Sequence, residues 1–179
     1  MPVLPLPAVT FAIETEAYQT LLARARRRTG RVPPELIARH VLSVTCGADW
    51  PVQRDALEAL LRRFAFGRAD QLQIVARPPK GRRLGLYATR RPGSPARPYR
   101  TLLRRIEPFE GSCDCADFLR SSLGLCKHLL TVLEDVTSRR GGLDEAGQEP
   151  IPNSSPLRWS GSSVPGMRSR ASSRRWSRS

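Results

Sequence analysis

Residues 111–128 read GSCDCADFLRSSLGLCKH and contain three of the four cysteines of this 179-residue chain. The spacing is Cys113-x-Cys115, then ten intervening residues, then Cys126-x-His128. Three thiolates and one imidazole form a donor set that suits tetrahedral Zn²⁺. Because four protein ligands close the coordination shell, the pattern predicts one structural zinc ion rather than a catalytic one.

The two halves of this pattern require different backbone conformations. Residues two apart on an extended segment point to the same side, so Cys113 and Cys115 can approach one ion as a strand ends. Residues two apart on a helix diverge by about 200°. We therefore expect Cys126 at the entrance of a helix and His128 in its first turn. That helix is predicted from apolar residues at helical spacing, namely Leu129, Val132, Leu133 and Val136.

Other interpretations of these cysteines remain open. Disulfides would need an oxidising compartment, and nothing in the sequence signals export. A nucleophilic Cys113 or Cys126 with His128 as its base lacks an orienting third group. The cysteines could also be unligated. Outside the cluster, Cys46 is expected to be a small buried residue at a helix end, and His40 a surface or packed histidine rather than a ligand.

Charge is distributed unevenly along the chain, whose formal net charge is +14. Residues 71–106 contain ten Lys or Arg and no acid, and residues 153–179 contain six Arg and no acid. Such local basic segments indicate an anionic partner, of which nucleic acid is the commonest. Arginine favours bidentate contact with phosphate. A GC-rich genome would also enrich arginine, and one sequence does not separate the two explanations.

The chain is predicted to be an α+β protein with four segments. Apolar spacing predicts helices over residues 16–28, 35–45 and 52–64. Alternation predicts strands over residues 71–76, 82–91 and 99–106, the last two forming a hairpin. The segments are a helical N-terminal region (1–70), an Arg-rich strand and loop lead-in (71–98), a zinc-bound strand–strand–helix unit (99–138) and a disordered Ser/Arg-rich tail (139–179).

The arginines of the hairpin are the candidate nucleic-acid contacts. Successive residues of a strand face opposite sides, so one of Arg90 and Arg91 should matter more than the other, as should one of Arg104 and Arg105. A solvated basic face without a partner is the alternative. The candidates are Arg82, Arg83, Arg90, Arg91, Arg100, Arg104 and Arg105.

The Cys-x-Cys and Cys-x-His pairs, preceded by strands and followed by an apolar helix, resemble the SWIM zinc finger over residues 99–137. The resemblance implies that Cys113, Cys115, Cys126 and His128 are the zinc ligands, and it implies a strand–strand–helix fold. The SWIM family is associated with DNA or protein binding. It occurs in bacterial proteins alongside chromatin-remodeller-type helicases, and in Mutator-type transposases and ubiquitin-ligase-like proteins of eukaryotes. The family implies no particular reaction, and residues 1–98 receive no support from it.

The sequence therefore predicts a non-enzymatic zinc module that binds nucleic acid, with DNA favoured, through the hairpin. The net charge of −5 over residues 107–152 argues that zinc itself does not face phosphate. The alternative is a protein-interaction module, either standalone or the N-terminal fragment of a chromatin-remodeller-type helicase.

Two further expectations concern partners and location. No glycine-rich loop ends in Gly-Lys-Ser/Thr, so any helicase or ATPase partner is expected on another chain. No apolar run reaches the roughly 20 residues that span a bilayer. We expect a cytoplasmic protein, in the bacterial cytosol if the family context holds.

Overall fold

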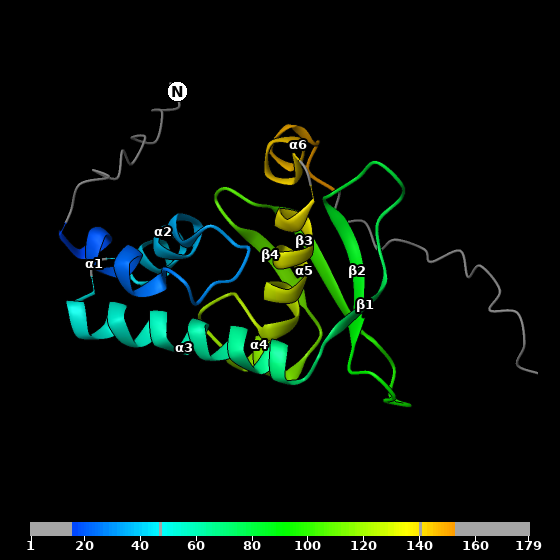
Figure 1. Cartoon of the computed structure of the whole chain (residues 1–179), viewed down its shortest axis with the longest axis horizontal. Coiled ribbons are helices and arrows are strands. Elements are labelled where there is room, and N and C mark those ends of the chain that lie inside the picture. Colours follow the sequence, from blue (N-terminus) through cyan, green and yellow to red (C-terminus); the bar gives the residue numbers. More distant parts are fainter. Residues whose placement is uncertain (1–15, 47, 140, 153–179) are drawn as a thin grey trace, which may run out of the picture.

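A computed structural model describes residues 16–46, 48–139 and 141–152 of the chain (Figure 1). Helices accompany one antiparallel sheet of four strands, which confirms the α+β class. The elements are α1 (Glu16–Ala25), α2 (Pro34–Val44), α3 (Trp50–Ala69), β1 (Gln73–Ala76), β2 (Gly85–Arg90), β3 (Tyr99–Arg105), β4 (Glu110–Cys113), α4 (Ala116–Arg120), α5 (Lys127–Ser138) and α6 (Gly142–Gln148).

The three predicted N-terminal helices are present, with different ends. Helix α1 stops at Ala25, and the next residues form turns in which Arg27 has a φ of 66° and Gly30 a φ of 64°. Helix α3 continues to Ala69, five residues beyond the predicted end at Phe64. It extends because its last turns pack against α5, where a Cβ added at Gly67 would lie 3.3 Å from Thr131 Oγ1.

The sheet has the order β1-β2-β3-β4, and each strand pairs antiparallel with the next. The predicted hairpin corresponds to β2 and β3, but β4 and the short α4 were not predicted. Strand β4 has the sequence EGSC, which lacks an alternating apolar pattern. It forms because β3 supplies a partner in register, with Thr101 opposite Cys113 and Leu103 opposite Gly111, and strand formation depends strongly on such context.

Helix α5 lies across one face of the sheet and also contacts α3 (Figure 1). Its apolar stripe is buried as predicted, with Leu129, Val132, Leu133 and Val136 each 0% exposed. A single hydrophobic cluster joins residues of α1, α2 and α3 to residues of the sheet and α5. The helical region and the cysteine segment therefore share one core, and packing in that core holds the cysteine segment in place.

Part of the segment predicted to be disordered has regular structure, so the prediction is wrong for residues 141–152. Helix α6 buries Ala146 in the core at 2% exposure. The Glu149 carboxylate accepts hydrogen bonds from the backbone N–H groups of Arg83 and Leu84. These contacts come from residues more than sixty positions earlier, so local composition could not reveal them. Residues 153–179, the rest of the predicted tail, lie outside the described residues.

Within the described ranges, no helix is both long enough and apolar enough to cross a membrane.

Candidate metal centre

The four predicted ligands converge on one point. The ligating atoms of Cys113, Cys115, Cys126 and His128 all lie within 4.8 Å of one another. Nδ1 of His128 lies 3.9 Å from Cys113 Sγ and 4.0 Å from Cys126 Sγ. In a tetrahedral zinc site, bond lengths of about 2.3 Å to sulfur and 2.0–2.1 Å to nitrogen place such atoms about 3.6 Å apart. Small side-chain movements would therefore let this cluster hold one metal ion.

Three elements bring the ligands together. Cys113 ends β4, and Cys126 is the N-cap of α5, with His128 in the first turn of that helix as predicted. The position of Cys115 was not predicted. Cys115 is the N-cap of α4, and its Sγ accepts a hydrogen bond from Phe118 N–H at 3.3 Å. A metal ion bound here would tie β4, α4 and α5 to one point.

Hydrogen bonds among the three thiols shift their pKa values in opposite directions. The pKa of Cys115 lies well below its usual range because Cys113 and Cys126 hydrogen-bond to its sulfur. The hydrogen bond with Cys115 raises the pKa of Cys113 to about 11, and hydrogen bonds with Cys113 and Cys115 raise the pKa of Cys126. Ligating sulfur must be deprotonated. A divalent cation would therefore take the place of the protons that Cys113 and Cys126 retain.

Burial separates the interpretations that the sequence left open. The exposed fractions are 4% for Cys113, 0% for Cys126 and 2% for His128, which leaves no accessible face for a substrate. That burial argues against a nucleophilic cysteine. All four cysteines are free thiols, so the structure contains no disulfide between them. The prediction for Cys46 is wrong: it is exposed, because α2 ends at Val44 and Thr45 takes the buried position after it.

Strand β3 holds the cluster in place from the adjacent position in the sheet. Asp114, between the first two cysteines, accepts a hydrogen bond from Arg100 N–H at 2.8 Å and donates its own N–H to Arg100 O at 3.1 Å. The ring of Tyr99 lies 4.5 Å from the ring of His128. Thr101 Oγ1 lies 3.5 Å from Cys113 Sγ. Three consecutive residues of β3 therefore contact the cluster or the loop that carries it.

Charged side chains of α3 and of Asp70, the residue that follows it, support the cluster, and sequence reasoning missed them. Arg63 binds the Asp117 carboxylate through two hydrogen bonds of 3.1 and 3.0 Å. Lys127, between two ligands, lies 2.5 Å from Asp70, and the pKa of Asp70 is lowered mainly by this hydrogen bond. Each pair joins residues more than fifty positions apart. No local pattern in the sequence signals such pairs.

His40 is a packed histidine, as predicted, and it anchors the loop before Cys126. Its Nε2 lies 2.7 Å from the carbonyl oxygen of Leu123. A carbonyl only accepts, so this nitrogen donates. Burial lowers the pKa of His40 from its usual 6.5. Above pH 6.5 the imidazole is neutral in both the folded and the unfolded chain, and its contribution to folding is fully present.

This linkage predicts an acid-sensitive contribution to stability. Between pH 6.5 and the lowered folded pKa, the unfolded chain binds a proton at His40 that the folded chain does not, so the free energy of unfolding falls as pH falls. His40→Gln keeps an N–H donor without titrating and should show a smaller fall. Urea unfolding of metal-loaded protein at pH 7.5 and 5.5 measures the difference. An equal fall in both proteins would contradict the assignment, since metal loss in acid is common to both.

The hairpin arginines divide into two groups. Four of them form ion pairs: Arg82 with Glu149 (3.7 Å), Arg83 with Glu145 (2.5 Å), Arg91 with Asp70 (2.5 Å) and Arg105 with Glu110 (3.2 Å). The other three, Arg90, Arg100 and Arg104, have no acidic partner for their side chains among the described residues. Arg97, in the exposed loop between β2 and β3, also lacks one there and was not among the predicted contacts.

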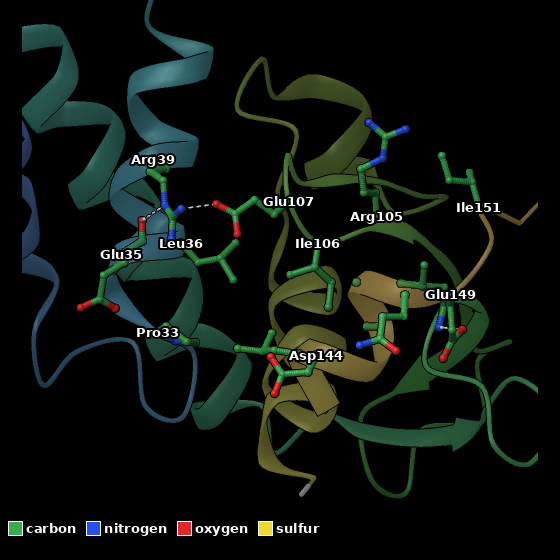
Figure 2. A pocket seen from close by; sticks show the side chains of 15 residues that line it. Pro33, Glu35, Leu36, Arg39, Arg105, Ile106, Glu107, Asp144, Glu149 and Ile151 are labelled. Carbon is green, nitrogen blue, oxygen red and sulfur yellow. Dashed lines mark hydrogen bonds and ion pairs between the residues drawn. The ribbon is translucent and has the colours of Figure 1, made fainter. Parts of the chain in front are cut away.

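A pocket lies away from the metal ligands, between α2, the end of β3 and α6 (Figure 2). Its volume is about 890 Å³. Leu36, Leu84 and Ile106 are buried in its lining. Figure 2 shows Arg39 joined to Glu107 by an ion pair at the opening. No sequence pattern indicated this pocket, because its lining comes from four segments that are distant in sequence.

Comparison with known proteins assigns this chain to no family. The chain matches no protein-family model, no curated protein and no solved structure.

Proposed function

We propose that this chain is a non-enzymatic, SWIM-type zinc module that binds nucleic acid, with DNA favoured, through the β2–β3 hairpin. The observation that carries the proposal is the convergence of three cysteine sulfurs and one histidine nitrogen within 4.8 Å. Burial of all four side chains leaves the site closed, which is typical of structural rather than catalytic zinc.

The donor set favours zinc over other cations. Thiolate sulfur is a soft ligand that suits zinc, whereas magnesium and calcium take oxygen ligands. A three-cysteine, one-histidine set is a common structural zinc site. In a cytoplasmic protein the thiols would stay reduced and available to the metal.

The charge of the hairpin supports the nucleic-acid part of the proposal. Residues 71–106 carry ten basic side chains and no acid, and internal ion pairs to other segments neutralise only some of them. Metal binding would stabilise this surface, because Tyr99 and the backbone of Arg100 contact the metal cluster and its loop. Zinc would thus organise the strand that bears the arginines without contacting phosphate itself.

The second candidate function is a protein-interaction module, standalone or part of a helicase. The pocket between α2 and α6 favours it, since an apolar floor with charged side chains at the opening suits a peptide or side chain of a partner. If a helicase or ATPase is that partner, we expect the motor on another chain or on further sequence.

Metal analysis and binding measurements test the proposal together. Nuclease-treated protein should contain one zinc per chain and should bind fluorescein-labelled duplex DNA at low salt, as measured by anisotropy. Removal of zinc by a chelator should abolish most of this binding, because β3 loses its anchor. If zinc-loaded protein binds neither duplex nor single-stranded nucleic acid, the nucleic-acid function is wrong and the interaction module replaces it.

A further inference from the structure

The two faces of the β2–β3 hairpin differ in burial. One face points to α5 and the core, and its residues Tyr87, Thr89, Thr101 and Leu103 are each 0% exposed. Side chains alternate between the faces of a strand. The intervening residues therefore form the opposite face, which we call the outer face: Leu86, Ala88 and Arg90 on β2, and Arg100 and Leu102 on β3. We include Arg104 with them because it is the next partly exposed residue of β3, at the register irregularity that follows Leu103.

Strand register places Arg90 and Arg100 close together on the two strands, and Arg104 lies further along β3. Arg100 lies opposite Ala88, and Arg90 follows two residues later on β2. Arg104 lies four residues from Arg100 along β3, which corresponds to about 13 Å. The small side chain of Ala88 leaves room for arginine side chains on either side of it.

These three strand arginines, like Arg97 in the loop of the hairpin, have no acidic partner within the described residues. The nearest acid to Arg100 along the paired backbone, Asp114, directs its carboxylate to the Arg100 N–H. The Nε atom of Arg104 is buried and has no hydrogen-bond partner among the described residues.

The ion-paired arginines have a different role. Arg91 joins the end of β2 to Asp70 after α3, and Arg82 joins the loop before β2 to Glu149 after α6. Arg105 pairs with Glu110 across the β3–β4 turn, next to a register irregularity between Leu103 and Arg105. That irregularity breaks the alternation expected of Arg104 and Arg105. Arg105 therefore differs from Arg104 in having an ion pair, and not in the strand face on which it lies.

We propose that Arg90, Arg100 and Arg104 bind the phosphates of duplex DNA, with little sequence preference. This inference rests on the proposed nucleic-acid function and names its ligand. The separation of about 13 Å between Arg100 and Arg104 is close to the major-groove width of about 12 Å. These two side chains can therefore reach phosphates on the two sides of one groove.

The composition of the outer face favours a duplex over a single strand. Proteins that bind single strands stack bases on aromatic side chains. The outer face has no aromatic residue on β2 or β3, because Tyr87 is buried in the core and Tyr99 lies against His128. The aliphatic side chains of Leu86 and Leu102 between the arginines cannot hydrogen-bond to base edges, so contacts to phosphate would dominate.

Two triple variants of the full chain test the inference at equal net charge. The first removes the outer-face arginines (Arg90→Ala, Arg100→Ala, Arg104→Ala), and the second removes ion-paired ones (Arg82→Ala, Arg91→Ala, Arg105→Ala). Anisotropy titrations with one duplex are run between 50 and 200 mM salt. If each outer-face arginine contacts one phosphate, the first variant should flatten the slope of log K against log salt by about 2.7. The second should flatten it by less than 1.

Circular dichroism and zinc content first establish that both variants are folded. Equal flattening by both variants, with wild-type binding intact, would overturn the inference and leave the nucleic-acid function standing. Tighter wild-type binding to a single strand than to the matched duplex would also overturn it. If the wild-type chain binds no nucleic acid at any salt concentration, the proposed function itself fails. A shuffled duplex of equal length should bind within a few-fold of the first.

Discussion

Cys126→Ser is expected to reduce the zinc content from one ion per chain to almost none and to unfold residues 99–138. Cys126 is fully buried at the entrance of α5 and supplies one of four donor atoms. Structural zinc in zinc-finger peptides contributes about 10–16 kcal/mol of apparent binding free energy at neutral pH. That is comparable to the total stability of a typical domain, about 5–15 kcal/mol, so loss of the ion should be severe.

Cys46→Ser is the matched control, since Cys46 is exposed and outside the cluster. It should leave zinc content and the circular dichroism spectrum unchanged. Zinc is measured by mass spectrometry of the metal after gel filtration, and local unfolding by hydrogen exchange over β3, β4 and α5. If both substitutions lower zinc content to the same extent, these four residues are not the ligands.

Gly111→Ala should weaken metal binding although it changes no ligand. A Cβ at Gly111 would lie 2.8 Å from Leu129 Cδ2 and 2.9 Å from the carbonyl oxygen of Leu102. Both distances are shorter than van der Waals contact, so the Leu129 side chain must shift and β4 must move relative to the Leu102 backbone on β3. Overpacking of this kind costs about 1–3 kcal/mol. The movement would also separate Cys113 on β4 from Cys126 and His128 on α5.

The matched control for this glycine is Gly147→Ala on α6, where an added Cβ would meet nothing within 4 Å. That variant should keep wild-type metal affinity and should have an unfolding midpoint at least as high as that of the wild type, because alanine favours a helix more than glycine does. Competition with a coloured zinc chelator measures affinity, and urea unfolding measures stability. Wild-type zinc affinity in Gly111→Ala would show that α5 and β4 need not approach so closely.

Adjacent residues of β3 link the metal centre to the outer face. Tyr99 lies against the His128 ring on the core side, while Arg100 lies on the opposite face and Arg104 follows at the register irregularity of the same strand. Any change that frees β3 from the cluster would also displace the arginines. The proposed binding of nucleic acid therefore depends on a metal ion that does not contact the nucleic acid. For this reason, removal of the metal by a chelator tests metal binding and nucleic-acid binding together.

The features that could be predicted from the sequence were those encoded by residues close together along the chain. The four donor residues fall within sixteen positions, and the apolar period after them defines α5. Local alternation marked β2 and β3, and Pro34 marked the start of α2, where a helix tolerates proline. In each case the information lies in neighbours along the chain, because helical and strand periods repeat over a few residues.

What only the tertiary structure decided depends on residues far apart in sequence. Strand β4 and helix α6 have weak local patterns and form because β3, the core and the β2 entrance provide their partners. The same holds for the division of the arginines. Arg90 and Arg91 are alike in sequence, yet Asp70, twenty-one positions away, neutralises only Arg91. Whether an arginine is available to a ligand is thus set by the acid that folding places beside it, and that placement is a property of the fold rather than of any segment.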